Sequence, residues 1–310
     1  MTRILHYPVS EVNEGRMAAR YLRELGFSRR NLTWLKADPQ GVLLNDEPAH
    51  LNARLHSGDI LTIKIREDEM SSLTPVDLPF GIIYEDDDLM VIDKPAGIPL
   101  HPSLHNVDNT LANALAWYFK CRQEPFVFRC SNRLDRDTSG LTIVSKHRVA
   151  AGMLSEMGVR REIVREYLAI VRGHVTPPSG TIDAPIGRVG DSIIERRIDP
   201  ENGERAVTHY KVVKEHNGLS LVLLNLETGR THQIRVHMKH IGFPLIGDHL
   251  YNPDDRTLIS RQALHAFRLS FIHPLTGTAL SFTAPLPEDM AELMPFETDN
   301  RPNVNSTVPQ

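Results

Sequence analysis

The segment spanning residues 129–142 contains the residue types best suited to chemistry. It reads Arg-Cys-Ser-Asn-Arg-Leu-Asp-Arg-Asp-Thr-Ser-Gly-Leu-Thr, so acids, arginines, hydroxyl side chains and a glycine occur together. At its centre Asp135 lies between Arg133 and Arg136, whose positive charges favour the ionised carboxylate. An ionised carboxylate that is held in place can act as a nucleophile or as a base.

Apolar residues flank this segment at 126–128 and 141–144, and they predict short buried strands that would hold the loop at both ends. A purely structural interpretation is also possible. Arg133 and Asp135 could form a structural ion pair, and Thr-Ser-Gly at 138–140 could be an ordinary turn. The segment alone does not decide between catalysis and structure.

A second segment, residues 226–237, reads Leu-Glu-Thr-Gly-Arg-Thr-His-Gln-Ile-Arg-Val-His. Residues 219–226 are rich in β-formers and predict a strand, which the Thr-Gly pair then ends. Ile234, Met238 and Ile241 recur at helical spacing, and the glycine that follows ends the run. The segment therefore predicts a strand that leads into a helix.

Basic residues near the start of this helix could hold an anion. We expect Arg230, His232 and Arg235 in its first turns, where the helix dipole would help them to bind a phosphate or a partner carboxylate. His232, His237 and His240 do not have the spacing of a metallohydrolase helix, and neither cysteines nor acids complete a ligand set. The sequence therefore predicts no metal site.

Three segments, in this order, resemble the signature motifs of the RluA-type pseudouridine synthases. They are Asn-Arg-Leu-Asp-Arg-Asp-Thr-Ser-Gly at 132–140, Arg-Glu-Tyr-Leu-Ala-Ile-Val-Arg-Gly at 165–173 and Thr-Gly-Arg-Thr-His-Gln-Ile-Arg-Val-His at 228–237. A fourth segment, residues 83–97, is similar to the strand-turn-strand that opens the catalytic domain in that family. The resemblance spans about residues 80–285.

The resemblance implies an enzyme that isomerises a uridine already within an RNA. The bond from the uracil nitrogen to the ribose is cut, the ring turns, and a carbon-carbon bond replaces it, with no cofactor. It makes Asp135 the carboxylate near the anomeric carbon, either as nucleophile or as base, and it pairs Arg235 with this acid. Asp137 is a possible second acid, because other enzymes that cleave glycosyl bonds use two carboxylates.

The resemblance also implies contacts with the target base. Tyr167 would lie against the uracil, because a base that has left its stack regains energy on a flat side chain; core packing is the alternative. Arg133 would replace the flipped base in the stack, or it would only contact a phosphate. The family often has His at the position of Asn132 and Lys at that of Arg165, so these two departures affect the fit of the substrate.

The first part of the chain predicts a separate small unit. Residues 14–25 carry apolar residues near helical spacing, and Ser28 is a good cap for a second helix through Ala37. Residues 42–44 and 60–65 predict strands. This order resembles the small RNA-binding module first known from a ribosomal small-subunit protein and often fused to these synthases.

Basic residues of the two predicted helices could follow RNA phosphates along one face. They are Arg16, Arg20, Arg23, Arg29, Arg30 and Lys36. A solvated helix surface is the alternative interpretation. RNA binding is favoured because the synthase motifs follow in the same chain.

Composition indicates two domains. A chain of 310 residues can bury a large core, and residues 67–79, acidic with serines and two prolines, indicate a linker. We expect a small RNA-binding module at 1–70, a linker at 71–80, a catalytic domain at 81–290 and a flexible tail at 291–310. The net charge of −4 suits RNA binding only if the basic residues gather on one face.

The fold that we expect is mixed α/β (α+β), with a curved, largely antiparallel central sheet flanked by helices and preceded by a small α+β module. The sequence shows no signal peptide, transmembrane run or internal repeat. Cys121 and Cys130 match no metal or redox spacing, which suits a reducing cytoplasm.

The leading function is conversion of uridine to pseudouridine in ribosomal or transfer RNA, by a cytoplasmic monomer that needs no metal, cofactor or membrane. One alternative is a non-catalytic RNA-binding or ribosome-assembly factor on the same scaffold. The presence of Asp135, Tyr167 and Arg235 argues against it. Another alternative is a glycosidase for small nucleosides, in which the N-terminal module would have no purpose.

Overall fold

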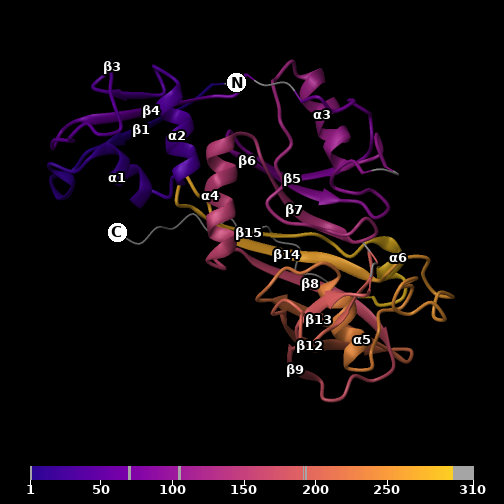
Figure 1. The fold of residues 1–310 in the computed structure, drawn as a ribbon. Coiled ribbons are helices and arrows are strands. Elements are labelled where there is room, and N and C mark those ends of the chain that lie inside the picture. Colours follow the sequence, from indigo (N-terminus) through magenta and orange to yellow (C-terminus); the bar gives the residue numbers. More distant parts are fainter. Residues whose placement is uncertain (1, 69–70, 104–105, 191, 193, 296–310) are drawn as a thin grey trace.

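The computed structural model describes residues 2–68, 71–103, 106–190, 192 and 194–295. It consists of a small N-terminal unit and a larger unit built on one long sheet, and helix α4 (Arg148–Val159) lies between the two in Figure 1.

The N-terminal unit packs two helices on a four-stranded antiparallel sheet. The strands, in sheet order, are β1 (Thr2–Pro8), β4 (Ile60–Arg66), β2 (Val42–Leu44) and β3 (Glu47–Pro48). The helical segments are a 3-10 turn, η1 (Glu11–Asn13), and the helices α1 (Ala18–Glu24) and α2 (Arg29–Ala37). The two strands predicted from the sequence are confirmed, and β1 and β3 come in addition to them.

The starts of α1 and α2 follow from local chemistry. Ser28 caps α2 as predicted: its hydroxyl accepts the Asn31 backbone N–H at 3.1 Å, and the Asn31 side-chain oxygen accepts the Ser28 N–H at 3.0 Å. The first helix is shorter than predicted, because Gly15 has a φ of +70° and Met17 is extended. Arg16 therefore lies before α1 and not on it.

The larger unit is built on a nine-stranded sheet. Its strands, in sheet order, are β5 (Gly81–Glu85), β6 (Leu89–Lys94), β7 (Ser139–Ser145), β14 (Leu264–Ile272), β8 (Val164–Arg172), β13 (Leu219–Leu226), β12 (Val207–His216) and β9 (Ser179–Asp183), with β15 (Ala279–Thr283) paired to β14. Among these pairs only β7 and β14 run parallel. Register shifts within β5, β12 and β14 bend the sheet.

Helices flank the long sheet (Figure 1). Besides α4 they are α3 (Leu111–Cys121), α5 (Gln233–His240) and the short α6 (Glu288–Ala291), and a hairpin of β10 (Ile186–Arg188) and β11 (Arg196–Ile198) packs beside α5. This arrangement confirms the predicted fold class: a mixed, largely antiparallel sheet with flanking helices, preceded by a small α+β unit.

Residues 126–128, predicted as a strand, form no strand in the structure. The ring of Phe126 stacks on that of Phe119 with centroids 4.1 Å apart, so the segment fills the core under α3 and does not join the sheet. The loop that follows is still held to β7, because the Ser131 backbone N–H donates to the Ile143 carbonyl at 2.9 Å.

Helix α4 connects the two units. Its Val149 and Met153 belong to the apolar core of the N-terminal unit. Glu67, which starts the segment predicted as a linker, is buried and accepts hydrogen bonds from the side chains of Arg129 and Arg148, both at 3.0 Å. The described residues from there to residue 80 form neither helix nor strand. The N-terminal unit is therefore packed against the larger unit as well as tethered to it.

Candidate active site

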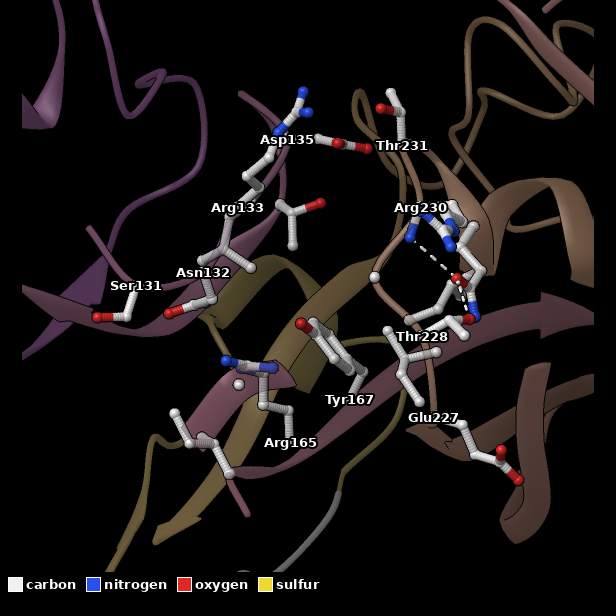
Figure 2. A pocket seen from close by; sticks show the side chains of 18 of the residues that line it. Ser131, Asn132, Arg133, Asp135, Arg165, Tyr167, Glu227, Thr228, Arg230 and Thr231 are labelled. Carbon is white, nitrogen blue, oxygen red and sulfur yellow. Dashed lines mark hydrogen bonds between the residues drawn. The ribbon is translucent and has the colours of Figure 1, made fainter. Parts of the chain in front are cut away.

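The three segments that carry the motifs converge on one pocket with a volume of about 770 Å³ (Figure 2). Residues 129–135 line it from the loop before β7, residues 163–165 and Tyr167 from the start of β8, and residues 225–235 from the end of β13 to α5. The sheet brings them together, because β7, β14, β8 and β13 are consecutive in its strand order. One side of α4 completes the wall.

Asp135 lies in this pocket against Arg235. Its Oδ2 accepts a hydrogen bond from Nη1 of Arg235 at 3.0 Å. The Asp135 side chain is 27% exposed, whereas that of Arg235 is only 4% exposed. The carboxylate is therefore open to the pocket, and its cation is buried behind it.

Asp248 holds the other edge of the Arg235 guanidinium. Its carboxylate accepts from Nε at 2.7 Å and from Nη2 at 2.8 Å, and it also accepts the backbone N–H groups of Leu250 and Tyr251. Burial opposes the charge of Arg235, but the hydrogen bonds and charges of both aspartates raise its pKa above the ordinary value. Arg235 is therefore a fixed cation that faces Asp135.

Sequence reasoning gave Asp248 no role. The signal that could have found it is chemical, because one carboxylate cannot satisfy the five N–H donors of a buried arginine. A second acid was therefore needed near Arg235. Asp248 is fully buried and meets that need.

Two cations hold the backbone that follows Asp135. The Nζ of buried Lys94 donates to the Arg136 carbonyl at 2.9 Å and to two carbonyls of its own turn. Burial lowers the pKa of Lys94 to about 7. Nη1 of Arg261 donates to the Asp137 carbonyl at 3.1 Å. These contacts fix the loop and, with it, the direction of the Asp135 side chain.

Tyr167 belongs both to the pocket wall and to the core. Tyr167 is 5% exposed, and its ring is part of the main apolar cluster. Figure 2 shows the hydroxyl end directed from β8 toward the middle of the pocket. Burial raises the pKa of Tyr167, and the charge of Arg165 opposes this shift. Within the described residues the hydroxyl has no hydrogen-bond partner, so one edge of the ring is available to a ligand.

His232 lies close to Asp135 as a neutral ring. The Tyr251 hydroxyl accepts the Arg196 backbone N–H at 2.9 Å and lies 2.9 Å from Nδ1 of His232. Donation from this hydroxyl to Nδ1 leaves the ring proton on Nε2, which is 3.8 Å from Oδ2 of Asp135. Burial lowers the pKa of His232 to about 4, so the ring carries no charge near pH 7.

The predicted positions of Arg230 and His232 on the helix are wrong. Both precede α5, because His232 has a φ of +57° and so interrupts a right-handed helix. The side-chain oxygen of Gln233 accepts the Arg230 backbone N–H at 3.0 Å and the Thr228 hydroxyl at 2.8 Å, which makes this stretch a fixed loop. The Arg230 side chain lines the pocket but is paired with Glu204.

The charges that were predicted beside Asp135 are placed differently in the structure. Arg136 binds Asp137 through two contacts of 3.0 and 2.9 Å, so Asp137 is held by an arginine on the surface side of the loop. Arg133 is exposed at the pocket edge and contacts no carboxylate in the described part of the chain. The cation that faces Asp135 is Arg235, and the structural pair of Arg133 with Asp135 is not formed.

His237 of α5 serves the fold. The two ring nitrogens of buried His237 lie 2.9 Å from a threonine hydroxyl and from a backbone carbonyl. Across the described ranges, the one group of acids and histidines close enough to share a metal ion is Asp86, Asp88 and His273. In that group Asp88 binds Arg3 of β1 at 2.8 Å, so this acid serves the contact between the two units.

The basic residues predicted to bind RNA divide into two sets. Arg16 and Arg20 both pair with Glu24, which neutralises part of α1. The others are exposed and have no carboxylate partner among the residues that the structure describes. They are Arg23, Arg29, Arg30 and Lys36.

Known proteins resemble the chain over most of its length. The family model of RNA pseudouridylate synthases matches residues 88–240. An uncharacterised RNA pseudouridine synthase of Bacillus subtilis (strain 168) is 42% identical over 278 residues, which cover 89% of this chain and 98% of that protein. Ribosomal large subunit pseudouridine synthase D of Escherichia coli (strain K12) is 39% identical over 272 residues, 82% of each chain.

A solved structure agrees with this result. Human RNA pseudouridylate synthase domain containing 1 is 29% identical, with a TM-score of 0.57 over 67% of this chain and 83% of that one. The chain therefore belongs to the RNA pseudouridine synthase family, in its RluA-type branch, and it is an isomerase that acts on RNA. The described helices include none long and apolar enough to cross a membrane.

Proposed function

We propose that the chain converts particular uridines of ribosomal RNA to pseudouridine, with Asp135 as the reacting carboxylate. The observation that supports this most is the arrangement of Asp135, Arg235 and Asp248, which presents a partly exposed carboxylate to the pocket against a buried cation. The name of the Escherichia coli relative supports ribosomal RNA as the substrate class. Transfer RNA is the alternative.

The proposed chemistry needs only side chains of this pocket. Breaking the bond between uracil N1 and ribose C1′ and forming one between C5 and C1′ neither adds nor removes atoms overall, because C5 loses a proton and N1 gains one. The carboxylate of Asp135 can add to C1′ or take a proton from the ribose. Arg235 orients this carboxylate through a charge-assisted hydrogen bond. His232 adds a neutral donor on the same side of the carboxylate.

We propose that Tyr167 supports the uracil while it is out of its stack. Tyr167→Ala should slow product formation about ten- to hundredfold, because stacking on an aromatic ring contributes about 1–3 kcal/mol per base. Tyr167→Phe keeps the ring and should lose much less. Turnover and RNA affinity are to be measured for both variants. Equal loss of turnover and binding in the alanine variant would favour the core-packing interpretation.

A direct test of the function is a map of pseudouridines in total RNA from cells with and without this gene. We expect particular ribosomal RNA uridines to lose the modification and to regain it when the wild-type gene is restored. A change confined to transfer RNA would show that the substrate is transfer RNA and not ribosomal RNA. An unchanged map would contradict the proposal and favour the non-catalytic ribosome-assembly alternative.

We also propose that residues 1–70 bind RNA, with 71–80 as the link to a catalytic domain at 81–290. The exposed cations of α2 and its surroundings support this, since Arg29, Arg30 and Lys36 have no carboxylate partner in the described ranges. The buried Glu67 and the core contacts of α4 make deletion of the unit a poor test, because deletion would expose Val149 and Met153.

Replacement of single charges tests the N-terminal unit without unfolding it. Arg29→Gln combined with Arg30→Gln should weaken RNA binding and flatten its salt dependence. The slope of log affinity against log salt should fall by about 0.7–0.9 for each RNA phosphate that the variant no longer neutralises. Arg20→Gln is the matched control, because Arg20 already has a carboxylate partner in Glu24. Unchanged affinity and slope in the double variant would show that this face is only a solvated surface.

We propose a cytoplasmic monomer as the working form. The free thiols of Cys121 and Cys130 support a reducing compartment. Light scattering of the purified protein would test the oligomeric state.

A further inference from the structure

The arginines that line the pocket differ in whether a carboxylate already neutralises them. Of these side chains, Arg129 pairs with Glu67, Arg161 with Glu227, Arg230 with Glu204, and Arg235 with Asp135 and Asp248. Two others, Arg133 and Arg165, have no carboxylate partner within the described residues. Arg133 is exposed at the edge. Arg165 is therefore the unneutralised cation of the pocket wall.

Arg165 is directed into the pocket by the geometry of its strand. It lies on β8 two residues before Tyr167, and alternate residues of a strand share a face. Figure 2 shows its guanidinium on the side of the pocket where Asn132 and Tyr167 also lie. Its Nε is buried and has no hydrogen-bond partner in the described chain. A charged donor left in this state is expected to receive its partner from a ligand.

Asn132 presents a second unpartnered donor to the same pocket. Its side-chain oxygen accepts the Ile143 backbone N–H at 3.1 Å and the Thr142 hydroxyl at 3.0 Å. A backbone N–H can only donate, so the oxygen must occupy that side and the amide nitrogen must point away from β7. That nitrogen is buried and unpartnered among the described residues. Asn132 and Arg165 both line the pocket.

We propose that Arg165 and Asn132 together bind a backbone phosphate of the RNA next to the target uridine. The pair offers donors and one uncompensated positive charge, and it offers no free acceptor. A phosphodiester supplies the negative charge and the acceptor oxygens that match it. A uracil carbonyl would satisfy the donors but would leave the charge of Arg165 without a counter-ion. This contact would hold the nucleotide flanking the target, while Asp135 faces the sugar, and it rests on the proposed function.

Asn132 is anchored to β7 by its side-chain oxygen, and Arg165 offers a planar fork of N–H donors, whereas a lysine at 165 would carry the same charge without that fixed geometry. Arg165→Lys keeps the charge and should recover only part of the binding. Arg165→Met removes the charge at similar length.

The test measures RNA binding in an Asp135→Asn background, so that turnover does not interfere. The probe is an RNA hairpin that spans the uridine identified by the pseudouridine map, together with hairpins in which one flanking phosphate is replaced by an uncharged methylphosphonate. Arg165→Met should weaken binding of the natural hairpin about ten- to hundredfold, as expected for loss of a charge-assisted hydrogen bond. The comparison variant is Arg161→Met, which removes another pocket arginine, one whose guanidinium contacts Glu227 at 2.9 Å, and it should weaken binding less than Arg165→Met.

The methylphosphonate hairpins show which RNA phosphate Arg165 contacts. At the contacted position it should weaken binding to the protein with Arg165 intact and have little further effect on the Arg165→Met variant. Asn132→Asp keeps the oxygen that accepts from Ile143 and replaces the free amide by a charge that repels phosphate, so it should weaken the natural hairpin more than the neutral one.

Two results would overturn the inference. Equal sensitivity of both proteins to every methylphosphonate would show that Arg165 contacts no phosphate. In the protein with Asp135 intact, a loss of turnover by Arg165→Met at unchanged affinity would point to the uracil. Both of these results can occur even if cells without the gene lose pseudouridines from their RNA. Failure of the proposed function would instead appear as a map that does not change.

Discussion

Asp135→Asn should abolish pseudouridine formation while leaving RNA affinity nearly unchanged. The amide is close in size to the carboxylate and can still accept a hydrogen bond from Arg235, but it has no negative charge to offer to the sugar. We expect turnover to fall by more than about a thousandfold, as for loss of a group that reacts directly with substrate. Single-turnover conversion and equilibrium binding on the same RNA measure the two effects separately.

The matched control for this prediction lies two residues further along the loop. Asp137→Asn makes the same chemical change at a carboxylate that is bound to Arg136. It should retain most of the activity, because the Asp137 carboxylate is engaged there and its carbonyl contact to Arg261 involves only the backbone. If the two asparagine variants were equally active, or if Asp137→Asn were the inactive one, the catalytic role would have to be reassigned.

Arg235→Met should damage both stability and activity. It would leave the Asp248 carboxylate, which is fully buried, without its cation, and it would leave Asp135 without the charge that faces it. Loss of one partner of a buried ion pair costs about 3–5 kcal/mol of the free energy of unfolding. Urea denaturation would measure this loss, and turnover at a temperature where the variant is still folded would measure the catalytic effect.

Two companion variants separate the roles of Arg235. Arg235→Lys keeps a charge but loses the fork that binds two carboxylates, so it should be intermediate in stability. Asp248→Asn removes only the second acid and should be milder than Arg235→Met, because its oxygen can still accept the backbone N–H groups of Leu250 and Tyr251. An Arg235→Met protein as stable as the wild type would contradict the buried pair.

The residues that local sequence can identify are those within the motifs. Asp135, Tyr167 and Arg235 are predicted from the resemblance of their segments to the family motifs, and the structure brings all three into one pocket. Asp248 and Lys94 receive no role from the sequence, because their importance depends on contacts that only the fold creates: Asp248 lies 13 residues after Arg235, and Lys94 lies 42 residues before Arg136. Lys94 reaches the Arg136 carbonyl across the fold. Such contacts leave no pattern in a single sequence.

Errors in the predicted elements also have physical reasons. Gly15 and His232 have positive φ values, and each makes a helix begin later than the apolar spacing suggests. The aromatic residues at 126–128 favour a strand, but Phe126 instead packs into the core, where its ring stacks on that of Phe119. Glu67 resembles part of an acidic linker, and tertiary pairing with arginines of the larger unit buries it.

The central claim, that Asp135 carries out the isomerisation in RNA, is tested most directly with purified protein and unmodified ribosomal RNA. Pseudouridine formation at each uridine is followed over time with the wild-type chain and with Asp135→Asn. We predict that the wild type converts one or a few defined uridines to completion and that the variant converts none of them, although it binds the same RNA. Conversion at these uridines by the variant, at a rate near that of the wild type, would contradict the claim.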